Sequence, residues 1–461
     1  MLTYNLSKSN RLPMYEQLYR NIRDDILSGK IKGESKLPSK RELAAHLCVS
    51  KVTVEAAYSL LVAEGYVYSL EKKGYYVESN LTSEYSKNNH QQTAENNIKK
   101  EYIVDLASNT VPPDKFPFNS WSGIMRKICL DYKQELLSPL PYNGALCLRK
   151  AISGYLYEYR GIAVKEDNII IGAGAEYLYS TVIKALNCKG KIAVEDPTYH
   201  KIINSYKSDG LDVRMLEMDK NGVMPDFLYK ADCDVIHISP AHNFPTGIVT
   251  TPKRRQDILN WLYQNENRYI IEDDFDSELR FGVNPVSSIY SLDKSGRVIY
   301  INSFSKTIAP SVRIAYCILP DEISEKYKHL FEKSGCTVSS FEQYTLAEFI
   351  SKGYFERHIN RNRKYYKTLR NRLIDIYNSS AINAKSSLID SAAGLHFLLK
   401  IETALSDKDL KNQLDKFGIK ATFYSDYCSD KNKKEHILLV NYSGLSENKF
   451  KIALDKLNKL I

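Results

Sequence analysis

Short apolar runs alternate with stretches of helical periodicity from Tyr102 to the end of the chain. The clearest runs are NIIIGAG, KIAVEDP, DVIHISP, RYIIEDD and RVIYINSFSK, each rich in Ile or Val and ending in polar or small residues. Strands that alternate with helices predict an α/β domain with a mainly parallel sheet and flanking helices. In such sheets ligands bind beyond the carboxyl ends of the strands. The residues at the ends of these runs are therefore where a site is expected.

A polar segment separates this region from the N-terminal part of the chain. Residues 80–101, NLTSEYSKNNHQQTAENNIKKE, contain no Phe or Trp and much Asn, Gln, Ser and Lys. Such a segment cannot bury enough apolar surface to offset the entropy of ordering it, which predicts a flexible linker. The chain of 461 residues is therefore expected to form two domains, residues 11–79 and residues 102–461.

The N-terminal domain has the pattern of a helix-turn-helix. Ser39 stands before one helical stretch and Glu42 follows three residues later, as in a capping box. Ser50 stands before a second, longer helical stretch. Two short helices joined by a tight turn at Cys48–Ser50 are typical of this DNA-binding motif. After Gly65, YVYSLEKKGYYV predicts two strands around a basic turn, which is a wing.

These segments resemble a known DNA-binding family. MYEQLY, LPSKRELA, VSKVTVEAAYSLLVAEG and KKGYYV are similar, in this order, to the motifs of the GntR-family winged helix. The first turn of the second helix usually enters the major groove, and a helix N-terminus favours phosphate. Residues 1–80 hold twelve Lys and Arg against nine Asp and Glu, so the position of the charges carries this prediction rather than their number. The residues expected to contact DNA are Ser39, Arg41, Ser50, Lys51, Thr53, Lys72 and Lys73.

The most informative motif of the second domain is INSFSKTIAPSVRIAY, residues 301–316. A strand leads to a Ser-rich turn, then to Lys306, then to Arg313. A lysine amine can form an imine with an aldehyde cofactor. Hydroxyl groups and a guanidinium can hold the phosphate of such a cofactor, and Ser303, Ser305 and Arg313 supply them.

Three further patterns fit the same chemistry. The strand RYIIEDD ends in carboxylates, and a carboxylate beside a pyridine nitrogen keeps that nitrogen protonated. GAGAE, residues 172–176, is a strand-to-helix turn whose backbone N–H groups can hold phosphate. Tyr199, after the next strand, can stack on a ring. Each pattern alone is common: a lysine in such a turn is usually solvated, and paired Asp residues often only cap a helix.

Together these patterns resemble the class I aminotransferase domain over residues 103–461, with FPFNSW, PYNGALCLRKAISGYLYEYRG, SPAHNFPTG and EDDFDSELRF as further matching stretches. A GntR winged helix fused to this domain resembles the MocR/GabR family of regulators. The resemblance implies a fold-type I domain with a smaller C-terminal subdomain, pyridoxal 5'-phosphate (PLP) as cofactor, promoter DNA as partner and a homodimer. It implies that Lys306 is the Schiff-base lysine, that Asp273 rather than Asp274 pairs with the pyridine nitrogen, and that Tyr199 stacks on the ring. The other expected cofactor-binding residues are Ala175, Glu176, Asn243, Ser303, Ser305 and Arg313.

The sequence departs from the aminotransferase pattern in three places. Phe275 stands where the family commonly has a Tyr that donates to the cofactor. Phe244 stands where catalytic aminotransferases have Asn before Pro-Thr-Gly, with Asn243 beside it. In HILLVNYSGL, Leu438 or Leu439 replaces the Arg that binds the substrate carboxylate in the enzymes. Whether an arginine from another segment, Arg361 or Arg363, binds the carboxylate instead is left open.

These departures favour a regulator that senses PLP or a PLP–amino acid adduct over an efficient aminotransferase, although a slow half-reaction is left open. A third alternative, a dimerisation scaffold without cofactor, is disfavoured because Lys306, Asp273 and Arg313 are intact. Vitamin B6 synthesis and amino-acid metabolism are equally possible as the controlled pathway. No two of the eight cysteines lie within four residues of each other, which favours a reducing cytoplasm over disulfides or a metal site. The absence of a long apolar run predicts no membrane span.

Overall fold

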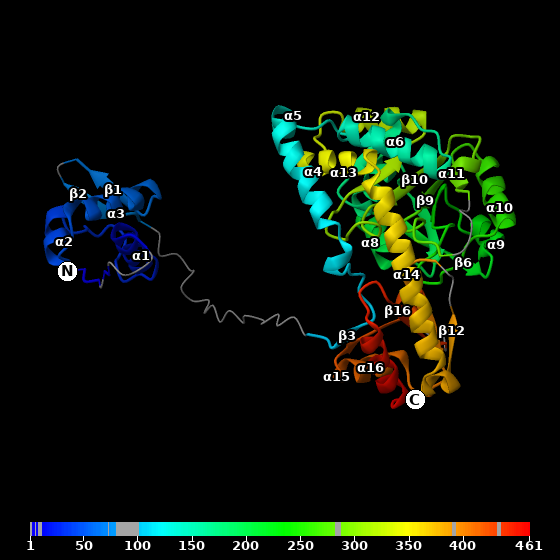
Figure 1. Cartoon of the computed structure of the whole chain (residues 1–461). Helices are drawn as coiled ribbons and strands as arrows, with labels where there is room; N and C mark the ends of the chain where they lie inside the picture. The colour runs from blue at the N-terminus through cyan, green and yellow to red at the C-terminus, as the bar shows by residue number, and fades with distance from the viewer. Residues whose placement is uncertain are drawn as a thin grey trace. The chain divides into compact units, whose positions relative to one another are not determined.

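The computed structural model describes residues 2–4, 6–7, 12–71, 73–79, 101–281, 287–389, 393–430 and 435–461. The chain divides into two compact units, Met1–Lys100 and Glu101–Ile461 (Figure 1). The predicted linker lies outside the described residues except for Glu101, and so does Lys72 of the wing. Predictions made for those residues remain predictions.

The first unit is a winged helix, as predicted. Its elements are α1 (Met14–Leu27), α2 (Lys40–His46), α3 (Lys51–Ala63), β1 (Val67–Leu70) and β2 (Gly74–Val77). β1 and β2 pair antiparallel, with Val67 opposite Val77. Apolar residues spaced three or four apart on the helices form one core with the hairpin, including the fully buried Leu18, Ile22 and Val54.

The second unit is built on an eight-stranded sheet with the order β4-β11-β10-β9-β8-β5-β6-β7. The five apolar runs form β4 (Ile169–Gly172), β5 (Lys191–Asp196), β8 (Val235–Ile238), β9 (Tyr269–Asp273) and β10 (Val298–Ser303); the others are β6 (Asp212–Asp219), β7 (Gly222–Val223) and β11 (Ala315–Ile318). β5, β6, β8, β9 and β10 pair parallel. β11 lies antiparallel between β4 and β10, so the sheet is mixed rather than wholly parallel.

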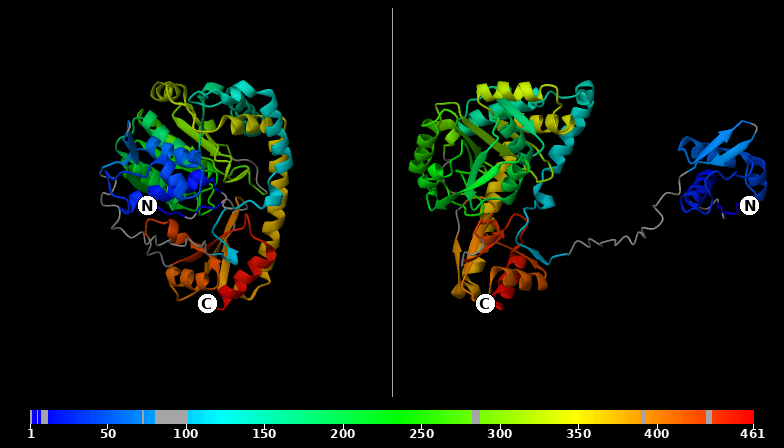
Figure 2. Two further views of the ribbon diagram at one scale, coloured as in Figure 1. Left: turned by 90° about the vertical axis from the view of Figure 1, so that its left-hand side faces the viewer. Right: turned by 180° about the vertical axis from the view of Figure 1, so that it is seen from behind.

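Helices cover both faces of this sheet (Figure 2). Alternate residues of a strand point to opposite faces: Tyr300 packs into one core cluster and Ile299 and Ile301 into another. One face is covered by α4 (Phe118–Asp131), α6 (Leu146–Arg160), α13 (Ser340–Ser351), α9 (Pro225–Lys230), α10 (Pro252–Tyr263) and α11 (Ile289–Leu292). The other is covered by α7 (Ala175–Ala185), α8 (His200–Ser208) and α12 (Asp321–Phe331). The short α5 (Lys133–Leu137) follows α4.

A smaller subdomain follows, as predicted. The long helix α14 (Tyr354–Asn378) connects it to the large sheet (Figure 1). Its four-stranded sheet has the order β12-β13-β16-β15, and α15 (Asp407–Lys416) and α16 (Glu447–Asn458) lie within the same subdomain. The strands are β12 (Ser386–Ile389), β13 (His396–Ile401), β15 (Thr422–Phe423) and β16 (His436–Asn441), and β14 (Ile419–Lys420) pairs with β3 (Val104–Asp105). Within the described ranges, no helix is long and apolar enough to cross a membrane.

Candidate cofactor site and DNA-binding surface

A cavity of about 540 Å³ opens at the carboxyl ends of the parallel strands. Eight of the nine predicted cofactor-site residues line it: Ala175, Glu176, Tyr199, Asp273, Ser303, Ser305, Lys306 and Arg313. They come from the ends of β9 and β10, the starts of α7 and α8, and the turns after β10. The fold therefore brings together residues that lie up to 138 positions apart in the sequence, at the edge where an α/β sheet binds ligands.

Lys306 lies in the turn that follows β10. Burial lowers the pKa of its amine, and the negative charge of Asp276 opposes that shift. An amine with a lowered pKa is more often neutral, and the neutral form is the nucleophile. The environment of Lys306 therefore suits an amine that bonds to a carbonyl group.

The two consecutive aspartates after β9 have different surroundings. Asp273 lines the cavity and accepts a hydrogen bond from the buried Tyr179 hydroxyl, with His237 Nε2 3.5 Å from its carboxylate. Asp274 instead forms a buried ion pair with Arg160 and accepts from the Tyr300 hydroxyl at 2.6 Å. Of the two, Asp273 has the position expected of a carboxylate that meets a pyridine nitrogen. Tyr179 was not predicted, because a tyrosine on the apolar side of a helix is usually a core residue.

The start of α7 forms an anion cradle with Arg313. Gly174 has φ +96°, and a Cβ there would lie 2.3 Å from Arg313 Nη2, so only glycine lets the guanidinium approach the backbone. Arg313 Nη2 lies 3.6 Å from Glu176 Oε2, and Lys201 Nζ lies 2.9 Å from Glu176 Oε1. A helix N-terminus, a guanidinium and the hydroxyls of nearby serines are the groups that hold phosphate. The residues present therefore fit the phosphate of PLP.

Aromatic rings line the opposite part of the cavity. Phe244 contacts Tyr199 and Tyr427 edge to face, with ring centroids 5.9 and 5.0 Å apart. Tyr427 belongs to the small subdomain, and its carbonyl accepts a hydrogen bond from Thr198 N at 3.2 Å. Sequence reasoning missed Tyr427, and it also missed the lining residues Ser108, Asn109 and Asn441. No local motif marks them, because they reach the cavity only through the tertiary fold.

Asn243 is the one predicted cofactor residue that the structure does not bring into the cavity. Its side chain is buried, donates to Glu195 Oε2 at 2.8 Å and accepts from Thr246 Oγ1 at 2.7 Å. Burial raises the pKa of Glu195 to about 7. Asn243 thus holds the turn behind the cavity, and the neighbouring Phe244 lines it.

Leu438 and Leu439, the two candidates for the position of the missing carboxylate-binding arginine, pack in different clusters. Leu439 lies opposite Leu398 in the β13–β16 pair, and both belong to a cluster that packs against Phe244. Leu438 belongs to the separate core of the small subdomain. Arg361 and Arg363 line two other hollows. Among the described residues, Arg313 is the one arginine that lines the cofactor cavity.

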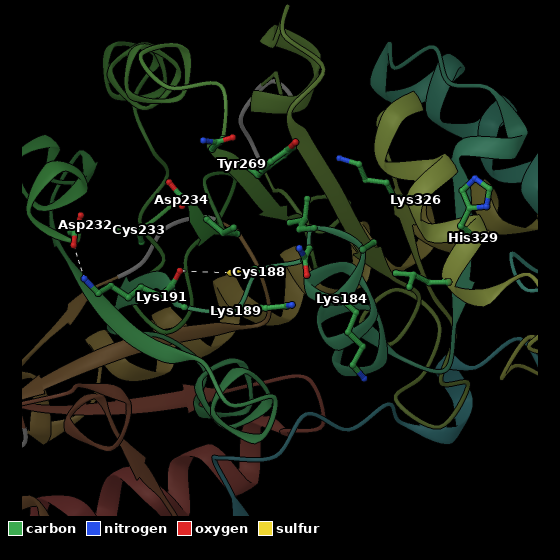
Figure 3. Close-up of a pocket in the computed structure, with 17 residues that line it drawn as sticks. Lys184, Cys188, Lys189, Lys191, Asp232, Cys233, Asp234, Tyr269, Lys326 and His329 are labelled. Carbon is green, nitrogen blue, oxygen red and sulfur yellow. Dashed lines mark hydrogen bonds and ion pairs between the residues drawn. The ribbon is translucent and has the colours of Figure 1, made fainter.

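A second hollow of about 870 Å³ lies at the amino ends of the strands, where β5, β8 and β9 begin (Figure 3). Its lining includes several lysines, but Lys191 pairs with Asp232 at 2.5 Å and Lys326 pairs with Glu322 at 2.6 Å. The predicted cofactor residues do not line it. It lies at the edge where parallel sheets do not usually bind ligands.

Five of the seven predicted DNA contacts, Ser39, Arg41, Ser50, Lys51 and Thr53, lie at the starts of α2 and α3, and Lys73 lies in the turn before β2. Ser39 forms a full capping box with Glu42, and Ser50 Oγ accepts from Thr53 N at 3.1 Å. These two hydroxyls fix the helix ends that would face DNA. Arg41, Lys51 and Lys73 are exposed. Val52 on the first turn of α3 is 73% exposed; it was not predicted, and an exposed apolar side chain there suits contact with a thymine methyl group.

Comparisons with known proteins agree with both units. The family described as "Bacterial regulatory proteins, gntR family" matches residues 14–77, and "Aminotransferase class I and II" matches residues 101–457. The HTH-type transcriptional regulator YhdI of Bacillus subtilis is 32% identical over 461 residues, covering 99% of this chain and 97% of the relative. The probable rhizopine catabolism regulatory protein MocR of Rhizobium meliloti is 29% identical, covering 78% and 76%. The pyridoxine biosynthesis regulator PdxR of Corynebacterium glutamicum is 27% identical, covering 76% of each chain.

Solved structures share the fold of the larger unit. An archaeal alanine:glyoxylate aminotransferase superposes with a TM-score of 0.71 at 21% identity, covering 79% of this chain and 92% of that one. The kynurenine aminotransferase of Pyrococcus horikoshii gives the same TM-score and identity, with 79% and 93% covered. The chain therefore belongs to the MocR/GabR-type transcription regulators, in which a GntR-family winged helix is joined to a fold-type I aminotransferase-like domain.

Proposed function

We propose that this protein is a cytoplasmic regulator that binds promoter DNA through its winged helix and holds PLP in its larger unit, so that PLP changes its affinity for DNA. The observation that carries the proposal is that Lys306, Asp273 and Arg313 line one cavity. An amine, a carboxylate and a guanidinium are the three groups needed for the carbonyl, the pyridine nitrogen and the phosphate of this cofactor. When bound, PLP supplies an electrophilic carbonyl and an electron-accepting ring.

Each residue has a defined task in this proposal. Lys306 would hold the cofactor through its amine, and Asp273, fixed by the Tyr179 hydroxyl, would face the pyridine nitrogen and favour its protonated form. Ser303, Ser305, Arg313 and the N-terminus of α7 hold the phosphate. Phe275 also lines the cavity, where it cannot donate a hydrogen bond to the cofactor's phenolic oxygen.

Control by PLP, rather than efficient transamination, is favoured by the lining of the cavity. Leu438 or Leu439 stands where the enzymes have an arginine for the substrate carboxylate, and Leu439 packs with Leu398 behind Phe244. A buried carboxylate without a charged partner is costly. We therefore propose that PLP alone is enough to change DNA binding. A relative named as a pyridoxine biosynthesis regulator supports vitamin B6 metabolism as the controlled pathway.

We also propose that the protein forms a homodimer. Large apolar side chains are exposed on α4, α5 and α6: Phe118, Leu130, Leu137, Leu146 and Tyr157 are 48 to 82% exposed. Large apolar side chains that are left exposed are often covered at a protein interface. A second copy of the chain would cover these side chains.

Lys51→Ala and Arg41→Ala should each weaken DNA binding about tenfold, since each side chain would neutralise a phosphate. Each should also make the slope of log affinity against log salt concentration shallower by roughly one. The target is selected from fragments of the organism's genomic DNA with the full-length protein, and affinity is measured by fluorescence anisotropy at several salt concentrations. Lys30→Ala is the matched control, because Lys30 pairs with Asp25 at 3.0 Å and is not at a helix start. Wild-type affinity in both test variants would contradict the proposed docking.

A further inference from the structure

A buried histidine and a buried aspartate lie behind the cofactor cavity and have no task in the proposed function. His242 Nδ1 and Asp276 Oδ2 are 2.8 Å apart, and the two side chains are 2% and 6% exposed. His242 belongs to the loop after β8, and Asp276 belongs to the loop after β9. A carboxylate removed from water is costly unless a partner meets it, and the imidazole is that partner. Two separate loops therefore keep a carboxylate in the interior at this place.

A segment of the small subdomain closes over this pair. Gly394 has φ +70°, and a Cβ there would lie 2.9 Å from Asp276 Oδ2 and closer still to the His242 ring. Only glycine permits this approach. Gly394 N donates to the Leu279 carbonyl at 2.9 Å, and the Gly394 carbonyl accepts from the Tyr442 hydroxyl at 2.8 Å. The backbone around the Asp276 carboxylate is thus held on both sides.

The pair lies directly behind two rings that line the cavity. The centroids of the His242 and Phe275 rings are 6.2 Å apart. The His396 ring lies 5.5 Å from His242 and 5.2 Å from the ring of Phe244. Phe275 and Phe244 line the same cavity as Lys306. One layer of side chains therefore separates the buried pair from the cofactor cavity.

The charge of Asp276 reaches several titratable groups among the described residues besides its imidazole partner. Burial lowers the pKa of the Lys306 amine and of the Arg280 guanidinium, and the negative charge of Asp276 opposes that shift in both. Burial raises the pKa of the Tyr442 hydroxyl and lowers the pKa of His396 to about 3, so these two side chains are neutral near pH 7. An arginine keeps its charge at any ordinary pH. Of these groups, Lys306 is the one that lines the cavity.

We propose that Asp276 is a positioning residue for Lys306: it holds a negative charge near the Lys306 nitrogen, so that this nitrogen keeps its proton inside the protein. For the cofactor-bound form, the inference rests on the proposed PLP site. Burial disfavours a charged nitrogen, and a fixed carboxylate offsets that cost. The proton matters because a link between a lysine and a carbonyl is opened by water or by a second amine in its protonated form. Asp276 would thus keep the attachment of the cofactor reversible.

Asp276→Asn tests this directly, because it removes the charge but keeps the size of the side chain and an oxygen that can accept from His242. Full-length protein carrying PLP is titrated with base, and the visible absorbance reports the loss of the proton from the Lys306 nitrogen. The pH midpoint should fall by at least about half a unit relative to wild type, since the protonated form loses a favourable charge. An unchanged or raised midpoint would overturn the inference.

Asp407→Asn is the matched control. Asp407 Oδ1 lies 2.7 Å from His436 Nδ1 in the small subdomain, so the same substitution alters the same kind of pair, and Asp407 does not line the cavity. The midpoint of this variant should equal that of wild type. Equal shifts in the two variants would also overturn the inference, because the effect would then not depend on the place of Asp276.

A second measurement needs no cofactor. Full-length protein freed of PLP is labelled with a trace of acetic anhydride over a range of pH, and the peptide that contains Lys306 is quantified by mass analysis. Because only the neutral amine reacts, the midpoint of labelling reports the proton on Lys306 itself. It should be lower in Asp276→Asn than in wild type, and an unchanged midpoint would overturn the inference, even in a variant that no longer binds PLP. A lowered midpoint together with failure of wild type to bind PLP would instead overturn the proposed function alone.

Discussion

Lys306→Ala should abolish the covalent link between this protein and PLP. Wild type incubated with PLP should absorb visible light, and borohydride should fix one cofactor per chain on the peptide that contains Lys306. The variant should show neither, because it lacks the amine in the turn after β10, whose pKa burial lowers. The measurement is a visible spectrum followed by peptide mass analysis.

Lys201→Ala is the matched control for this experiment. Lys201 lines the same cavity, but its ammonium pairs with Glu176 at 2.9 Å at the phosphate end. Its removal should leave the covalent link intact and at most weaken PLP binding. A link that survives in Lys306→Ala and disappears in Lys201→Ala would contradict the assignment of the lysine.

Arg160→Ala should destabilise the larger unit by about 3 to 5 kcal/mol, because it leaves a buried carboxylate without its charged partner. The side chains of Arg160 and Asp274 are 9% and 1% exposed, and the Tyr300 hydroxyl alone would then donate to Asp274 at 2.6 Å. The free energy of unfolding is measured by urea denaturation followed by tryptophan fluorescence. Both tryptophans of the chain, Trp121 and Trp261, belong to this unit.

Lys165→Ala provides the comparison, since Lys165 and Asp321 form an ion pair at 2.9 Å whose side chains are 73% and 71% exposed. An exposed pair contributes about 0 to 1 kcal/mol, so this variant should unfold close to wild type. Equal effects of the two substitutions would show that burial does not set the strength of the Arg160–Asp274 pair.

Local sequence patterns were enough to predict the main elements and eight residues that the fold brings together in the cavity. The five apolar runs became strands because Ile and Val recur over strand-length segments between helices. Lys306 and Arg313 were selected because a lysine that can form an imine and an arginine that can hold phosphate follow the same strand. In the first unit, Ser39 and Ser50 marked the starts of two helices because their hydroxyls cap free backbone N–H groups.

The parts that were missed depend on contacts between distant segments. Tyr427 and Asn441 reach the cavity only because the small subdomain packs beside the carboxyl ends of β5 and β9. Tyr179 has the spacing of a core residue, and only the fold shows that its hydroxyl meets Asp273. Asn243 was placed in the site from its neighbourhood in the sequence, but Glu195, which no local pattern marked, binds its amide instead.

The most direct test of the account is the affinity for the selected genomic DNA fragment, measured with and without PLP for full-length wild type and Lys306→Ala. Saturating PLP should change the affinity of wild type at least about fivefold, which is the usual size of coupling between two sites, and should change that of Lys306→Ala much less. An unchanged affinity in wild-type protein that carries PLP on Lys306 would contradict the claim that this cofactor controls DNA binding.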